Sequence, residues 1–468
     1  MKPMTNLNPA PAPRKSTGSR LLSALYASVW RWHFYAGLIF APFLIILAFS
    51  GSVYLFKPQI EGYLYKDMLT VREVGTQALP ADEIVMRTMQ AYPGTSVSSV
   101  TFVDDPGATV KLGAVRNGVA QTMYADPYTG NIRGMLDNDK TFAAFFKKMH
   151  SELVVGGTWA NRLVELAACW GIILVITGLY LWWPRNRSAI WGTLLPRLSK
   201  PGSRQFWRDL HAVPAFWLSL CIVILIATGL PWSGVLGPQI DRVANATHTN
   251  YPPYALSFLG TPESVTVTKD VAEDIPWAAE QLPVPESAAG GYVKLTVDEV
   301  TGIAERQQIA MPFTISMPQG ERGVYTIATS HTRPGDNATL HVDQYSGAVL
   351  TDVRFADYGI MAKAITLGIA LHEGRLFGWP NQLLGLITCL GVILIAFSSY
   401  VMWKKRKPAG KLGAPGKPAD ARATWGVLAI MIVFGLLMPL VGLSLLVVLV
   451  LDLLVIRRIG RLKHWFSA

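Results

Sequence analysis

Charged residues are scarce in this sequence. They make up 16% of its 468 residues, whereas hydrophobic residues make up 51%. Soluble domains carry roughly 25% charged residues. The composition therefore excludes an ordinary soluble protein of this length and predicts segments that lie in lipid.

Cysteine and several cofactor motifs are also lacking. The three cysteines, Cys169, Cys221 and Cys389, each lie inside an apolar run, so we expect buried packing residues and no disulfide framework. The sequence has no glycine-rich phosphate loop, no flavin or nicotinamide fingerprint and no zinc-protease His-Glu-x-x-His. If the chain handles electrons, another molecule must deliver them.

Long apolar runs are abundant instead. A bilayer core of about 30 Å is crossed by about 20 apolar residues in a helix. Four runs meet this requirement: Phe34–Phe56, Leu163–Trp183, Ala212–Trp232 and Leu383–Trp403. A fifth run, Trp425–Ile456, is too long for one ordinary span and is interrupted by Pro439 and Gly442. The interruption favours a hairpin of two short helices, with a single span as the alternative.

The distribution of charge predicts the orientation, because short cytoplasmic loops are enriched in Lys and Arg. Residues 185–210 hold six Lys and Arg and residues 404–423 hold seven. Residues 57–161 and 235–380 together hold 19 Lys and Arg against 27 Asp and Glu. We therefore expect the basic loops in the cytoplasm beside anionic lipid and the acidic segments outside. The net charge of +11 then needs no nucleic acid as a partner.

These predictions give an α-helical integral membrane protein of the cytoplasmic membrane, with both termini in the cytoplasm and two extracytoplasmic α+β domains. The expected order is a cytoplasmic arm (1–32), a first span (33–56), an outside domain with an interfacial helix (57–161), a second span (162–184), a cytoplasmic loop (185–210), a third span (211–234), a second outside domain (235–380), a fourth span (381–403), a cytoplasmic loop (404–423), a helical hairpin (424–456) and a cytoplasmic tail (457–468).

The chain also contains an internal parallel repeat. A shift of 220 residues aligns Asn161 with Asn381, Cys169 with Cys389, Tyr180 with Tyr400 and Trp183 with Trp403. A shift of 178 residues aligns His33 with His211 and Gly51 with Gly229. Both halves therefore run helix, outside domain, helix in the same direction, so corresponding residues are expected at similar depth.

The outside domains repeat as well. A helix is expected at Ala81–Ala91, and the expected strands are Ser98–Val103, Thr109–Ala114, Val293–Val297, Phe313–Met317 and Tyr325–Ser330. Each domain then has an Asp-x-Tyr-Thr/Ser-Gly turn, at Asp126–Gly130 and at Asp343–Gly347. In each turn Asp opens the reversal and Gly can supply a positive φ before the next strand.

With two helix pairs that each enclose such a domain, the sequence over about residues 25–405 resembles the PepSY-associated transmembrane family. That family includes PiuB-type proteins and the ferrisiderophore reductase FoxB. The resemblance implies two PepSY-like domains outside the inner membrane of a bacterium. It also implies a role in iron uptake, with ferric siderophore as the substrate.

Four of the eight histidines occupy repeat-matched positions at helix ends. His33 and His211 are expected near the inner face, and His150 and His372 near the outer face. Ionisable groups at such places point to function, and neutral imidazoles are axial ligands of haem iron. We therefore expect each pair to ligate one haem b, and Arg31 and Arg208 to pair with haem propionates. The bland alternative is that each histidine only anchors its helix.

Other polar residues in the spans are expected to be structural. Glu165 lies near the start of the second span, three residues after Arg162, which can neutralise it. Asn161 and Asn381 are expected to cap or link helices, and Asp452 to pair with the basic residues that follow it.

The sequence thus favours a haem-dependent ferric-siderophore reductase that passes electrons outward across the membrane. Its donor is a cytoplasmic reductase or the quinone pool. One alternative is a non-catalytic PepSY protein that binds a peptide or a protease. Another is a siderophore transporter or import accessory, which is less favoured because no pair of broken mid-membrane helices is evident.

Overall fold

The computed structural model describes residues 17–184, 190–250, 266–287, 293–330, 332–416 and 421–466. Parts of the predicted N-terminal arm, the cytoplasmic loops, the second outside domain and the C-terminal tail lie outside the described residues. The chain divides into two compact units. A helical unit comprises Met1–Ile45, Leu166–Val223 and Gly391–Ala468, and a mixed unit comprises Ile46–Glu165 and Ile224–Leu390.

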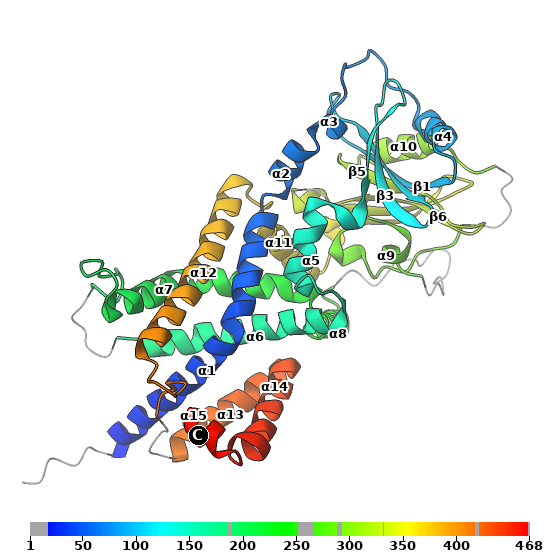
Figure 1. The fold of residues 1–468 in the computed structure, drawn as a ribbon. Helices are drawn as coiled ribbons and strands as arrows, with labels where there is room; N and C mark the ends of the chain where they lie inside the picture. The colour runs from blue at the N-terminus through cyan, green and yellow to red at the C-terminus, as the bar shows by residue number, and fades with distance from the viewer. Residues whose placement is uncertain are drawn as a thin grey trace, which may run out of the picture. The chain divides into compact units, whose positions relative to one another are not determined.

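Helices make up most of the structure (Figure 1). Their bounds are α1 Thr17–Tyr54, α2 Lys57–Leu64, α3 Lys66–Leu69, α4 Ala81–Ala91, α5 Phe142–Glu152, α6 Gly157–Trp182, α7 Arg204–Gly229, α8 Leu236–Ala246, α9 Thr268–Val271, α10 Val297–Arg306, α11 Ile360–His372, α12 Trp379–Arg406, α13 Ala421–Leu437, α14 Pro439–Leu451 and α15 Gly460–Phe466.

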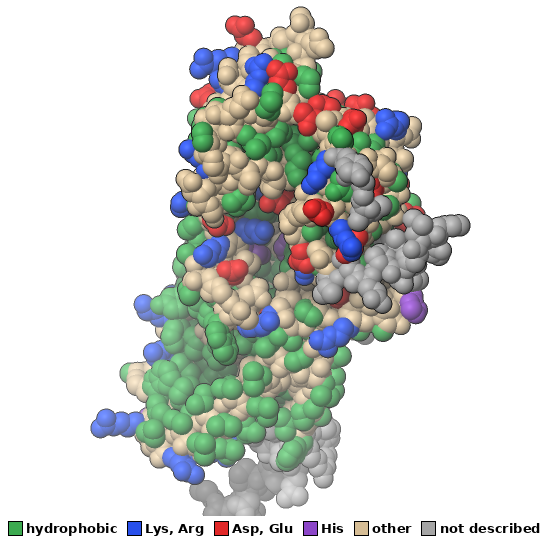
Figure 2. Space-filling view, turned by 90° about the vertical axis from the view of Figure 1, so that its right-hand side faces the viewer, with side chains coloured by type: hydrophobic (Ala, Val, Ile, Leu, Met, Phe, Trp, Pro, Cys, Tyr) green, Lys and Arg blue, Asp and Glu red, His purple; other side chains and the backbone are tan. Residues whose placement is uncertain are grey.

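Five helical segments in the described part of the chain are long and apolar enough to cross a membrane: Leu22–Tyr54, Gly157–Trp182, Arg204–Trp232, Trp379–Arg406 and Pro439–Ile456. Many of their apolar side chains face away from the protein. On the face drawn in Figure 2, hydrophobic side chains predominate in the helical part, whereas the β-rich part carries Asp, Glu, Lys and Arg. Exposed apolar side chains on helices of this length need lipid as their solvent, so the protein is a multi-pass membrane protein.

The last apolar run forms two helices, α13 and α14, and the chain reverses at Met438. A Cβ added to Gly442 would lie 2.8 Å from the carbonyl oxygen of Gly435. In one continuous helix these residues would be about 10.5 Å apart along the axis. The two glycines therefore let the helices of the hairpin touch at their backbones.

The mixed unit contains one antiparallel sheet of eight strands: β1 Thr95–Phe102, β2 Val110–Arg116, β3 Val119–Ala125, β4 Ile132–Asp137, β5 Phe313–Ser316, β6 Val324–Thr329, β7 Ala338–Asp343 and β8 Val349–Arg354. Its order is β4-β3-β2-β1-β5-β6-β7-β8. The segments predicted as two separate outside domains thus share a sheet through β1 and β5. Each half would otherwise leave the backbone groups of a long edge strand unpaired.

Helices α4 and α10 pack on the same face of this sheet. Ile84 of α4 and Val300 of α10 join Leu112 and Ile327 in a single buried apolar core. The starts of the two helices are cross-linked reciprocally. Asp298 accepts hydrogen bonds from the backbone of α4 at Ala81 and Asp82, and Asp82 accepts bonds from the backbone of α10 at Val297 and Asp298. Each helix therefore supplies a carboxylate that accepts from first-turn N–H groups of the other.

The two predicted Asp-to-Gly turns are confirmed. Asp126 Oδ1 accepts from the backbone N–H groups two and three residues later, at 2.9 and 3.2 Å, and Asp343 Oδ1 does the same at 2.9 and 2.8 Å. Gly130 and Gly347 have φ of +73° and +72°, the left-handed region that glycine enters at no steric cost.

One strand prediction is wrong. Val293–Val297 is not a strand, because Thr296 caps the start of α10 and Val297 is its first residue. Thr296 Oγ1 accepts from the backbone of Glu299, and the Glu299 carboxylate accepts from the backbone of Thr296. The Thr-x-x-Glu capping box is a helix start signal that outweighs the β-branched residues.

The exchanged caps can be tested at Asp298. Asp298→Ala removes the acceptors of two α4 N–H groups, a loss of about 1 kcal/mol. We expect the unfolding midpoint of the detergent-purified protein to fall by about 2–4 °C. Glu305→Ala, an exposed position on the same helix, is the control and should leave the midpoint unchanged. Equal shifts in the two variants would contradict the capping role.

Candidate functional site

The structure brings His33 of α1 and His211 of α7 together in the helical unit. Their ring centroids are 6.4 Å apart, and the rings are close to perpendicular at 82°. His33 Nδ1 lies 2.9 Å from Thr177 Oγ1, and that hydroxyl donates its own hydrogen to the carbonyl oxygen of Ile173. His211 Nδ1 lies 2.9 Å from the carbonyl oxygen of Ile395.

The mixed unit holds the second pair, His150 at the end of α5 and His372 at the end of α11. Their ring centroids are 6.1 Å apart, at an angle of 69°. Both helices lie outside the candidate spans. Burial lowers the pKa of His150 to about 4, with the neighbouring His372 adding to the effect. Burial also lowers the pKa of His372, so both imidazoles are neutral near pH 7.

Repeat-equivalent partners hold these two imidazoles. His150 Nδ1 contacts a carbonyl oxygen of α1 at 3.0 Å and a hydroxyl of α1 at 3.2 Å. His372 Nδ1 contacts a carbonyl oxygen of α7 at 2.9 Å and a hydroxyl of α7 at 3.2 Å. The partners are Leu47 and Ser50 on α1 and Leu225 and Thr228 on α7, each pair related by 178 residues.

These contacts fix the position of the ring proton in all four histidines. A carbonyl oxygen can only accept, so Nδ1 must donate in His150, His211 and His372. The hydroxyl beside His33 has already donated its hydrogen, so His33 Nδ1 donates as well. Nε2 then carries a lone pair in every ring. Among the described residues, Nε2 of these four rings has no hydrogen-bond partner, which is the state a metal ligand requires.

The spacing of each pair fits two ligands on opposite sides of one metal ion. Metal–imidazole bonds of about 2.0–2.1 Å and the radii of the two rings put such centroids roughly 6.4 Å apart. The observed separations are 6.4 and 6.1 Å. Within the described part of the chain, no three His, Cys, Asp or Glu side chains group together, as a protein-only zinc or calcium site would require. Haem needs only two axial ligands, because the porphyrin supplies the other four.

Glycine lets the helices approach these rings. A Cβ added to Gly51 or to Gly229 would lie 3.1 Å from Cε1 of His150 or of His372, respectively. A Cβ added to Gly178 would lie 3.3 Å from Cε1 of His33. The rings of His33, His150 and His372 therefore each pack against a helix backbone at a glycine, where a larger residue would crowd the ring.

Arg31 and Arg208, expected to pair with haem propionates, are placed on protein partners. Arg31 Nη1 donates to the carbonyl oxygen of Pro415 at 2.7 Å. Arg208 forms an ion pair of 2.8 Å with the fully buried carboxylate of Asp209. A propionate could therefore recruit either arginine only in competition with these contacts. The propionate role stays a prediction.

The other polar residues singled out in the spans have structural partners. Glu165 is buried and accepts two backbone N–H groups at the start of α8. Asn161 and Asn381 each donate to a carbonyl ten residues earlier, tying α5 to α6 and α11 to α12. Asp452 pairs with Arg457 at 2.8 Å. Within the described residues, Cys169, Cys221 and Cys389 form no disulfide bond.

Of the other histidines in the described part of the chain, none joins these pairs, and His331 lies outside the described residues. His341 is buried in β7 between the hydroxyls of Thr268 and Thr326, and burial lowers its pKa to about 4. His464 is exposed on α15.

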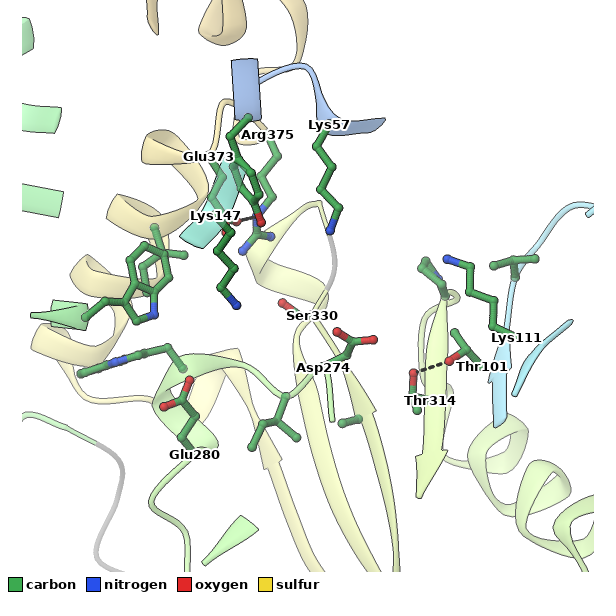
Figure 3. A pocket seen from close by; sticks show the side chains of 18 residues that line it. Lys57, Thr101, Lys111, Lys147, Asp274, Glu280, Thr314, Ser330, Glu373 and Arg375 are labelled. Atoms are coloured by element: carbon green, nitrogen blue, oxygen red, sulfur yellow. Dashed lines mark hydrogen bonds and ion pairs between the residues drawn. The ribbon is translucent and has the colours of Figure 1, made fainter. Parts of the chain in front are cut away.

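A cleft of about 530 Å³ lies beside the second pair, within the mixed unit (Figure 3). Trp232, at the end of the third predicted span, lines it. The indole ring also packs edge-on against His372, with centroids 6.2 Å apart. Neither the lining of the cleft nor the position of Trp232 was foreseen from the sequence, because the lining comes from segments that are far apart along the chain.

Comparison with known protein families identifies the family to which this chain belongs. The family described as PepSY-associated TM region matches residues 30–406. The chain belongs to this family. The matched range of this PepSY-associated membrane protein includes all four paired histidines. A comparison with curated proteins finds no match.

The close packing of glycine against imidazole is testable. Alanine at a helical glycine normally stabilises a helix by about 0.5–1 kcal/mol. Gly51→Ala and Gly229→Ala should instead destabilise the protein by about 1–3 kcal/mol, because the added methyl presses on a buried ring. Gly62→Ala on α2 is the matched control, since nothing lies within 4 Å of its added Cβ. A rise of the unfolding midpoint in all three variants would contradict the packing.

Proposed function

We propose that this PepSY-associated protein is a haem-containing reductase of the bacterial inner membrane that passes electrons outward to a ferric siderophore. The observation that supports it is the geometry of two imidazole pairs, each spaced for one metal ion and each with Nε2 unbonded among the described residues. When bound, haem b supplies a reversible one-electron carrier, and its two histidine ligands leave no open position for oxygen.

The chain's own residues prepare the imidazoles for this role. The Nδ1–H donors are held by helix carbonyls and hydroxyls, which fix the ring orientation and increase the basicity of Nε2. Histidine side chains held in this way lose little conformational entropy when they bind haem. Each pair combines one histidine from each half of the sequence repeat, and one pair is proposed for each membrane face.

The proposed reaction releases iron because its two oxidation states prefer different ligands. The hard oxygen donors of a siderophore hold Fe(III) tightly and Fe(II) far less tightly. A cytoplasmic reductase or the quinone pool is proposed as the electron donor. The alternatives, a peptide- or protease-binding protein and a siderophore import accessory, give no reason for imidazole pairs at this spacing.

Haem binding is tested by absorbance. We expect the purified protein to be red, with a reducible low-spin b-type spectrum and two haems per chain. His33→Ala and His211→Ala should each remove the same haem and leave the other. His464→Ala, an exposed histidine, is the control and should retain both. Colourless protein from haem-replete cells would refute the proposal, and loss of both haems in a single variant would refute the pairing.

The substrate is tested by rapid mixing. Protein reduced with dithionite, and then freed of excess reductant, should be reoxidised by ferric siderophore under anaerobic conditions, with release of Fe(II) to a ferrous chelator. The apo-siderophore should not change the spectrum. If several ferric chelates of different chemistry all fail to reoxidise the protein, the haem sites would stand and the substrate assignment would fall.

A further inference from the structure

The cleft beside His372 is lined mainly by charged and polar side chains. Four cations face it, namely Lys57, Lys111, Lys147 and Arg375, and three carboxylates, namely Asp274, Glu280 and Glu373. Hydroxyls of three side chains add further hydrogen-bonding groups, from Thr101, Thr314 and Ser330. A cleft of about 530 Å³ has the size of small-molecule sites, which are typically about 300–1,000 Å³.

The charges in the cleft do not cancel. Arg375 pairs with Glu373 at 2.6 Å, so these two neutralise each other. Within the described residues, the three lysines make no ion pair, and the carboxylates left to oppose them are Asp274 and Glu280. Glu280 is half-buried, and burial raises its pKa despite the nearby Lys147. The excess of positive charge therefore attracts an anion.

The lysines come from separate elements and extend into the same space. Lys57 begins α2, Lys111 lies on β2 and Lys147 lies on α5. Figure 3 shows Lys57 and Lys147 reaching from one side toward Asp274, with Lys111 on the strand at the other side. A ligand held among them would be contacted from more than one direction. This arrangement suits a compact chelate that carries several carboxylates.

One aromatic side chain connects this cleft to the histidine pair. Trp232 lines the cleft and contacts His372 edge-on at 6.2 Å between centroids. Ile369, one turn before His372 on α11, also lines it. A ligand in the cleft is therefore separated from the His372 imidazole by a single layer of side chains.

We propose that this cleft binds the electron acceptor as an anionic ferric chelate whose carboxylates are held by Lys57, Lys111 and Lys147. This inference rests on the proposed function, since it names the class of acceptor. It predicts preference by charge: a carboxylate-rich chelate binds well, and a neutral trihydroxamate chelate of similar size binds less well.

Binding can be measured separately from electron transfer with gallium(III), which replaces iron(III) in such chelates and is not reduced. Titration calorimetry on the full-length protein in detergent would compare gallium citrate with a neutral gallium trihydroxamate. The triple variant Lys57→Gln, Lys111→Gln, Lys147→Gln should weaken citrate binding by about tenfold, the loss of three partly exposed ion pairs. Affinity for citrate should also fall as sodium chloride is raised.

Two matched variants control for folding. Lys148→Gln removes the same charge from the next position of α5, which does not line the cleft, and should bind citrate as the parent does. Arginine at the three lysine positions should restore binding. The inference would be overturned if the parent protein did not bind gallium citrate. It would also be overturned if the triple lysine variant bound gallium citrate and the neutral gallium trihydroxamate equally more weakly than the parent does. If the purified protein lacks haem, or if ferric chelates do not reoxidise it, the proposed function is refuted. Gallium citrate binding in that same protein would still support the charge-selective cleft.

Discussion

The hydrogen bond from each imidazole Nδ1–H to an oxygen of a neighbouring helix is the interaction on which the candidate site depends. A buried ring nitrogen without a partner is costly, so this bond decides which nitrogen carries the proton and how far the ring can turn. It also joins helices within each unit, α1 to α6 and α7 to α12 in one unit, and α5 to α1 and α11 to α7 in the other. The contacts that stabilise these helix pairs thus also leave Nε2 as the unprotonated nitrogen of each ring.

The pairing of the four histidines could be predicted from the sequence because similar residues recur at fixed shifts in its two halves. The repeat separated His33, His211, His150 and His372 from four histidines without counterparts, and the structure pairs them as the repeat suggested. The sequence could not give the Nδ1 partners. Helix carbonyls carry no sequence signal, and hydroxyls such as Thr228 also occur in spans for packing alone. The close approach of Gly229 likewise required knowledge of which helix lies beside it.

The fold was predicted more reliably within elements than between them. Ala81–Ala91 forms a helix with the expected bounds, because its buried positions have helical spacing. The strand predicted at Val293–Val297 was wrong, because β-branched residues before a capping box have the composition of a strand. The joining of the two halves into one sheet also escaped prediction. The pairing of β1 with β5 depends on backbone groups, and these are the same in every residue.

That pairing has a consequence for the biogenesis of the protein. Ser99 of β1 pairs with Ser316 of β5. The ribosome must therefore add more than two hundred residues, including α6 and α7, before β1 acquires β5 as its second neighbour beside β2. Until then one edge of β1 is unpaired, and such edges recruit other chains. The nascent protein must therefore be shielded or held in an incomplete state while synthesis continues. The eight-stranded sheet is therefore complete only after the second half of the chain has been translated.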